Sequence, residues 1–92
     1  MSPEEEIRRA ERARAILGDP LVTEALAALE SAATEAWRST GAHDVDTRER
    51  AWLMLRLAER FRAHFESLVE NGRLAKSRLV ELERERRFTL FR

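Results

Sequence analysis

Apolar residues spaced three and four positions apart run without interruption through the second half of the chain. This spacing is the period of a helix with one buried face. It predicts a single helix from Thr47 to about Arg87, which at 1.5 Å per residue would be roughly 60 Å long. The residues that carry the pattern are Met54, Leu57, Phe61, Phe65, Leu68, Gly72, Ala75, Leu79 and Leu82.

The pair Asn71-Gly72 is the weak point of this predicted helix. A glycine inside a helix costs about 1 kcal/mol relative to alanine, and it could instead cap a shorter helix. Because the apolar phase continues across the pair, we expect a continuous helix or one with a slight bend.

Two shorter helices are predicted upstream. Ser2 and Pro3 followed by three glutamates have the form of an N-cap, a proline at the first helical position and acids near the helix dipole. This helix should run to about Leu17, where Gly18 is predicted to end it in a left-handed conformation. Asp19-Pro20 repeats the start signal and begins the second helix.

A polar loop from Ser39 to Val45 follows the second helix, and Asp46 with Glu49 resembles a capping box that starts the third. The sequence therefore predicts an all-α fold, a helical hairpin with a short N-terminal helix and a long C-terminal helix, forming one domain over residues 1–87. Antiparallel pairing of the second and third helices predicts an intrachain core of Trp37, Leu29, Leu57 and Phe61.

The long helix is expected to need a second chain. A chain of 92 residues has a thin core, and without cysteine it has no disulfide to reinforce it. Residues beyond about Leu68 outrun the second helix, so only the first helix or another chain can cover them. The sequence thus predicts a coiled-coil-like homo-oligomer with the candidate interface Leu68, Ala75, Leu79 and Leu82.

The last residues, 88–92, lose the helical period and are predicted to form a short extended or disordered tail. Exposed aromatic side chains on a basic terminal segment are typical of a docking peptide. The candidate docking residues are Phe88, Leu90 and Phe91.

Charge is unevenly distributed although the net charge is zero. Residues 1–46 hold 5 basic and 10 acidic side chains, and residues 47–92 hold 12 and 7. Cations in the last twenty residues make non-specific contact with double-stranded DNA a hypothesis, although interleaved glutamates are equally typical of a solvated helix face. The candidate DNA-binding residues are Arg73, Lys76, Arg78, Arg84, Arg86 and Arg87.

No catalytic, cofactor or metal site is predicted. His43 and His64 are far apart in the hairpin scheme, so they do not provide the three or four ligands of a zinc site. No serine has a glycine elbow or a neighbouring histidine, and phosphate-binding glycine loops are absent. The chain also lacks an apolar run of about 20 residues, so we expect a soluble, non-enzymatic protein with no small-molecule substrate and no membrane partner.

The segment from Ala10 to Leu79 resembles small helical proteins of tailed bacteriophages, of the small terminase subunit type. The resemblance is carried by Asp19-Pro20-Leu21-Val22, Glu35-Ala36-Trp37-Arg38 and Arg50-Ala51-Trp52-Leu53-Met54-Leu55. It implies a non-catalytic subunit in the cytoplasm of a bacterial host cell, which assembles into a ring, binds DNA and regulates the large motor subunit of a DNA-packaging machine. The N-terminal helix-turn-helix domain of that family is missing here, which favours non-specific DNA binding.

Two other classes of protein fit the same periodicity. One is a coiled-coil adaptor or virion structural protein with no DNA role, and the other is a small regulator that sequesters a partner through a helix face. A ring predicts roughly seven to twelve subunits and an adaptor about two to four, so the subunit number separates these classes.

Overall fold

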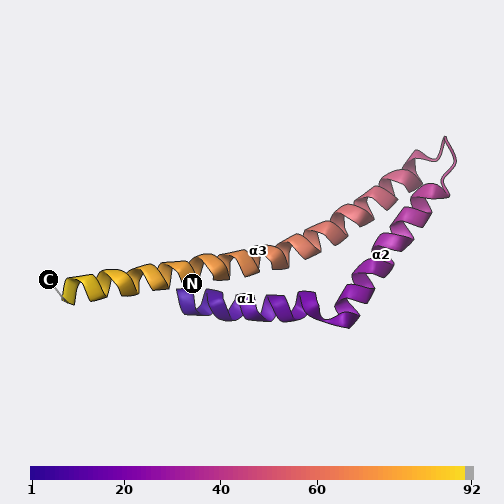
Figure 1. Ribbon diagram of the computed structural model, residues 1–92. Coiled ribbons are helices and arrows are strands. Elements are labelled where there is room, and N and C mark those ends of the chain that lie inside the picture. Colours follow the sequence, from indigo (N-terminus) through magenta and orange to yellow (C-terminus); the bar gives the residue numbers. More distant parts are fainter. Residues whose placement is uncertain (91–92) are drawn as a thin grey trace. The chain divides into compact units, whose positions relative to one another are not determined.

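The computed structural model describes residues 1–90, and this part of the chain forms three helices. They are α1 (Pro3–Gly18), α2 (Pro20–Arg38) and α3 (Val45–Leu90), as Figure 1 shows. The predicted all-α class is confirmed. The long predicted helix is also confirmed, because α3 continues through Asn71 and Gly72 without a break over its 46 residues.

Polar side chains cap the first two helices as the sequence predicts. The Ser2 hydroxyl accepts a hydrogen bond from the Glu5 backbone N–H at 3.2 Å, and Asp19 Oδ1 accepts one from the Leu21 N–H at 2.8 Å. The left-handed conformation predicted for Gly18 is wrong, since no described residue has a positive φ. Asp19 makes the corner instead, with extended backbone at φ −69° and ψ 123°.

We expect Asp19→Ala to lower the free energy of unfolding by about 1 kcal/mol, because it removes the acceptor that satisfies the free N–H of Leu21. Asp19→Asn keeps an acceptor oxygen and should retain most of the stability. Urea denaturation of both variants measures the difference. Equal stabilities of the two variants would contradict a capping role for this side chain.

The start of α3 lies earlier than predicted. The helix begins at Val45, and Asp44 rather than Asp46 is its cap: Asp44 Oδ1 accepts a hydrogen bond from the Thr47 backbone N–H at 3.3 Å. The predicted capping box of Asp46 and Glu49 is therefore wrong. Asp44 lies at the end of the predicted loop, and the sequence pattern alone did not distinguish it from Asp46 as the cap.

The end of α3 also differs from the prediction. Residues 88–90 are helical rather than extended, and the Thr89 hydroxyl donates a hydrogen bond to the Glu85 carbonyl at 2.9 Å, as within a helix. The predicted tail over residues 88–92 is therefore wrong for its first three positions. Phe91, a candidate docking residue, lies outside the described residues.

The chain divides into two compact units, each a pair of adjacent helical segments. The first unit joins Met1–Ile16 with the part of α3 from Phe65 onward. Its buried residues are all small: Ala10, Ala13, Gly72 and Ala75. A Cβ atom added to Gly72 would overlap the Cβ of Ala10 and lie 3.2 Å from the Glu6 carbonyl oxygen. Gly72 therefore allows α1 to approach α3 closely.

The second unit, Leu17–His64, is a hairpin of α2 and the first part of α3. Arg62 of α3 pairs with Glu30 of α2 at 2.8 Å across it. The buried residues are Leu26, Ala33, Ala51 and Ala58.

The core predicted for this hairpin is wrong. Trp37, Leu29, Leu57 and Phe61 are between 45% and 65% exposed. Small residues can approach more closely than large ones, so the helices meet along Ala33, Ala51 and Ala58 and leave the larger side chains on the flanks. The large apolar residues do form a stripe, as the sequence pattern predicted, but this stripe lies beside the contact between the helices and not within it.

Candidate interaction surfaces

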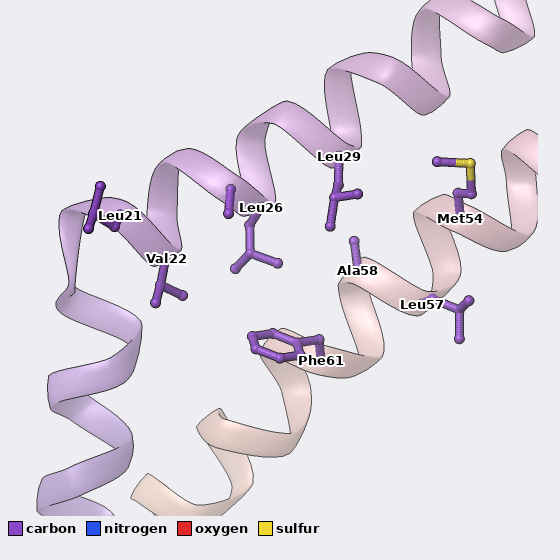
Figure 2. A pocket seen from close by; sticks show the side chains of 9 residues that line it. Leu21, Val22, Leu26, Leu29, Met54, Leu57, Ala58 and Phe61 are labelled. Carbon is purple, nitrogen blue, oxygen red and sulfur yellow. The ribbon is translucent and has the colours of Figure 1, made fainter.

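An open apolar groove runs along one flank of the α2–α3 hairpin, with a volume of about 610 Å³. In Figure 2, Val22 and Leu29 of α2 point toward α3 and Phe61 of α3 points toward α2, whereas Leu57 lies at the edge and points away from α2. The lining of the groove contains no charged or hydrogen-bonding side chain. The lining residues are Leu21, Val22, Ala25, Leu26 and Leu29 of α2 and Met54, Leu57, Ala58 and Phe61 of α3. We call this surface the α2–α3 groove.

The floor and the rim of the α2–α3 groove differ in exposure. Leu26 and Ala58 are buried at its floor, whereas Leu21 is 74% exposed and Leu57 is 65% exposed at its rim. Burying a large apolar side chain that is otherwise exposed is worth about 1.5–3 kcal/mol. A continuous exposed surface of this kind marks an interaction site more often than a free surface. The groove is suited to bind another apolar helix surface.

The predicted oligomer interface lies in the first unit, and its four residues differ in how far they are buried. Ala75 is completely buried against its own chain, so it is not available to another chain. Leu68 and Leu79 are half-buried, and Leu82 is half-exposed. Three of the four predicted interface residues are thus wholly or partly covered within the first unit, and only Leu82 is left exposed.

The two described docking candidates, Phe88 and Leu90, lie on the last turns of α3 and are largely exposed. All residues from 81 to 90 are exposed, and this segment includes Leu82. Their apolar side chains are interspersed with charged ones, so they do not form a groove like that of the hairpin.

Two of the six candidate DNA-binding residues form ion pairs with a glutamate of the same helix. Arg73 makes hydrogen bonds of 2.6 and 2.9 Å to the carboxylate of Glu70, and the bonded guanidinium lowers the pKa of Glu70. Arg87 pairs with Glu83 at 3.4 Å. The other four candidates form no ion pair among residues 1–90: Lys76, Arg78, Arg84 and Arg86.

Lys76 and Arg84 line one shallow hollow on α3 together with Arg73, Ser77, Val80 and Glu81. Arg78 and Arg86 do not line it. The cations therefore lie on exposed positions along α3 and do not converge on one point, an arrangement that suits an extended polyanion better than a small anion.

Within residues 1–90, no three histidine, cysteine, aspartate or glutamate side chains lie close enough to hold a metal ion. His43 lies in the loop before α3 and His64 lies on α3. None of the three described helices combines the length and the apolar character that a membrane span requires.

Comparisons with protein families, characterised proteins and solved structures gave no match to this chain.

Proposed function

We propose that this protein is a non-catalytic subunit that assembles with copies of itself through the α2–α3 groove. The observation that carries this proposal is the exposure of large apolar side chains along a groove with no polar lining. Alanines form the contact between α2 and α3 and leave the larger residues of the hairpin for an external surface.

The magnitude of the expected gain is consistent with self-association. Five large groove residues are about half-exposed, so closing the groove would stabilise by about 1 kcal/mol for each, or about 10 kcal/mol for two copies. The loss of translational and rotational freedom costs about 4–15 kcal/mol. The two terms are of similar size, so the whole groove must close for a stable assembly. The five residues are Leu21, Leu29, Met54, Leu57 and Phe61.

The mass of the assembly in solution tests this proposal. The smallest of these association costs leaves a net gain of about 6 kcal/mol, which corresponds to a dissociation constant of tens of micromolar. Sedimentation velocity and native mass spectrometry of the full chain at concentrations up to about 1 mM should therefore show an oligomer. A folded monomer under these conditions would contradict the proposal. A mass of about two to four chains would favour an adaptor or virion structural protein, and about seven to twelve would favour a ring.

The finer proposal is a subunit of a phage-type DNA-packaging machine, which binds double-stranded DNA non-specifically and regulates a large motor subunit. The sequence resemblance supports it, and so do the four cations of α3 that have no carboxylate partner within residues 1–90. A coiled-coil adaptor without a DNA role is the alternative.

We expect DNA affinity to fall steeply with salt, with a slope in a log–log plot of about −0.9 for each phosphate contact. The double variant Arg84→Ala/Arg86→Ala should flatten this slope, because it removes cations that are not already paired. The matched control is Arg73→Ala/Arg87→Ala, which removes two paired cations and should change the slope less. A mobility-shift titration at low salt measures both. Absence of binding by the intact oligomer would favour the adaptor.

A further inference from the structure

We infer that two copies of the α2–α3 hairpin dock groove to groove about a two-fold axis parallel to the helices, so that α2 of each copy lies beside α3 of the other. This arrangement is a four-helix bundle made from two hairpins. The inference rests on the proposed self-association and specifies its geometry.

A second copy of this chain has the apolar helical surface that is needed to cover the α2–α3 groove. The open side of the groove needs an apolar helical surface, and the rim of the groove is itself such a surface, with Leu21 on one side and Leu57 on the other. An interface between identical patches must be self-complementary in this way. Two grooves that face one another cover each other's exposed leucines.

The two helices of the hairpin carry opposite charge. Helix α2 has three glutamates and one arginine. The α3 segment 45–64 has five arginines against three acids. Two pairs of these sets already form within the hairpin: Glu30 of α2 with Arg62 of α3, and Arg56 with Glu59 within α3. The excess that remains is acidic on α2 and basic on α3.

The excess charges border the α2–α3 groove. Glu24 follows the rim residue Leu21 by three positions, and Arg60 follows the rim residue Leu57 by three, so each charge lies on the same helical row as a rim leucine. Arg50 precedes Leu57 by seven positions and Asp46 precedes it by eleven, so this row of α3 carries two bases and one acid. All four charged residues are exposed. A helix that covers the groove from outside meets these charges.

With their helices aligned, two hairpins that meet groove to groove can be related by a two-fold axis in two ways. An axis perpendicular to the helices places α2 beside α2 and α3 beside α3, which juxtaposes acid with acid and arginine with arginine. An axis parallel to the helices places each acidic α2 beside a basic α3. Like charges at an interface disfavour the first arrangement and opposite charges favour the second. The axis parallel to the helices is therefore selected.

The two arrangements differ most in where the hairpin loops lie. An axis parallel to the helices brings both loops to the same end of the bundle, whereas a perpendicular axis sends them to opposite ends. From the middle of the groove near Ala25 to the end of α2 is about 13 residues, or about 20 Å. The perpendicular arrangement thus separates the two loops by at least about 40 Å.

A spin label on the loop distinguishes the arrangements. The chain has no cysteine, and a side chain at Gly41 would meet no atom within 4 Å, so Gly41→Cys offers a single labelling site. In double electron–electron resonance of the full-length oligomer, we expect a shortest distance of about 15–30 Å between labels, as the spacing of neighbouring helices in a bundle implies. A shortest distance above about 40 Å would overturn the inference.

A second label provides the control. Ser31 lies near the middle of α2 and lines a hollow that shares no residue with the α2–α3 groove. Labels at Ser31→Cys should lie about 30 Å apart in both groove-to-groove arrangements. Short distances at Gly41 together with much longer ones at Ser31 would show docking through another surface and also overturn the inference. If neither label gave an intermolecular distance, the chain would be monomeric, and the proposed self-association itself would fail.

Discussion

Replacing Leu57 with glutamate should convert the assembly into a folded monomer. Leu57 is 65% exposed in the single chain, so the substitution removes little packing within the hairpin. In the assembly each copy would instead place an unpaired carboxylate in an apolar groove, which is strongly unfavourable. We expect the dissociation constant to rise at least about 100-fold, equivalent to about 2.7 kcal/mol. Sedimentation equilibrium measures the mass, and circular dichroism measures the helix content.

Leu82→Glu is the matched control, because it introduces the same charge on the same helix. Leu82 is 52% exposed, but it belongs to the first unit and lies outside the α2–α3 groove. This variant should remain oligomeric. If Leu82→Glu dissociated the assembly and Leu57→Glu did not, the interface would be on the C-terminal part of α3, and the groove would have another role.

The helices of this protein could be predicted from the sequence because they depend on local chemistry. The acceptor oxygens of Ser2 and Asp19 precede the prolines that begin α1 and α2, and their hydrogen bonds are present in the structure. The unbroken apolar phase predicted the long α3. Errors at this level were small. Asp44 instead of Asp46 caps α3, and the helix extends to Leu90 instead of ending near Arg87.

The site was harder to predict because it depends on which side of each helix faces the other. The large residues Leu57 and Phe61 have the spacing of a core stripe, and the sequence pattern assigned them to one. The structure buries Ala51 and Ala58 instead, which are seven residues apart and about a third of a turn or less away from that stripe. The recurrence of alanine at this interval is the signal that could have predicted the contact. Periodicity of large residues alone does not distinguish a core from its flank.

Gly72 illustrates a second limit of local reasoning. From the sequence it is only a residue that weakens a helix. The structure gives it a tertiary reason, since Ala10 of α1 occupies the space where a side chain would lie. No pattern within α3 identifies that neighbour, because the pairing of α1 with α3 joins residues far apart in the chain.

Gly72→Ala should therefore destabilise the packing of α1 on α3, although alanine is the better helix former. The substitution gains about 1 kcal/mol of helix propensity at an open site. Here the new methyl group would overlap the Cβ of Ala10, and overpacking of this kind costs about 1–3 kcal/mol, or more where the backbone must move. We expect faster amide hydrogen exchange throughout α1, which reports the local stability of this unit.

Ala10→Gly should reverse the sign of this effect. With that methyl group removed, the closest remaining neighbours of a side chain at position 72 are the Glu6 carbonyl oxygen at 3.2 Å and the Cα of Ala10 at 3.6 Å, which small shifts can accommodate. In this background Gly72→Ala should slow hydrogen exchange in α1, and the coupling between the two positions should be at least about 1 kcal/mol. The open control is Gly18→Ala, where no atom lies within 4 Å and the backbone is not left-handed, so it should be neutral or stabilising. Equal effects of Gly72→Ala in both backgrounds would show that Ala10 does not contact this position.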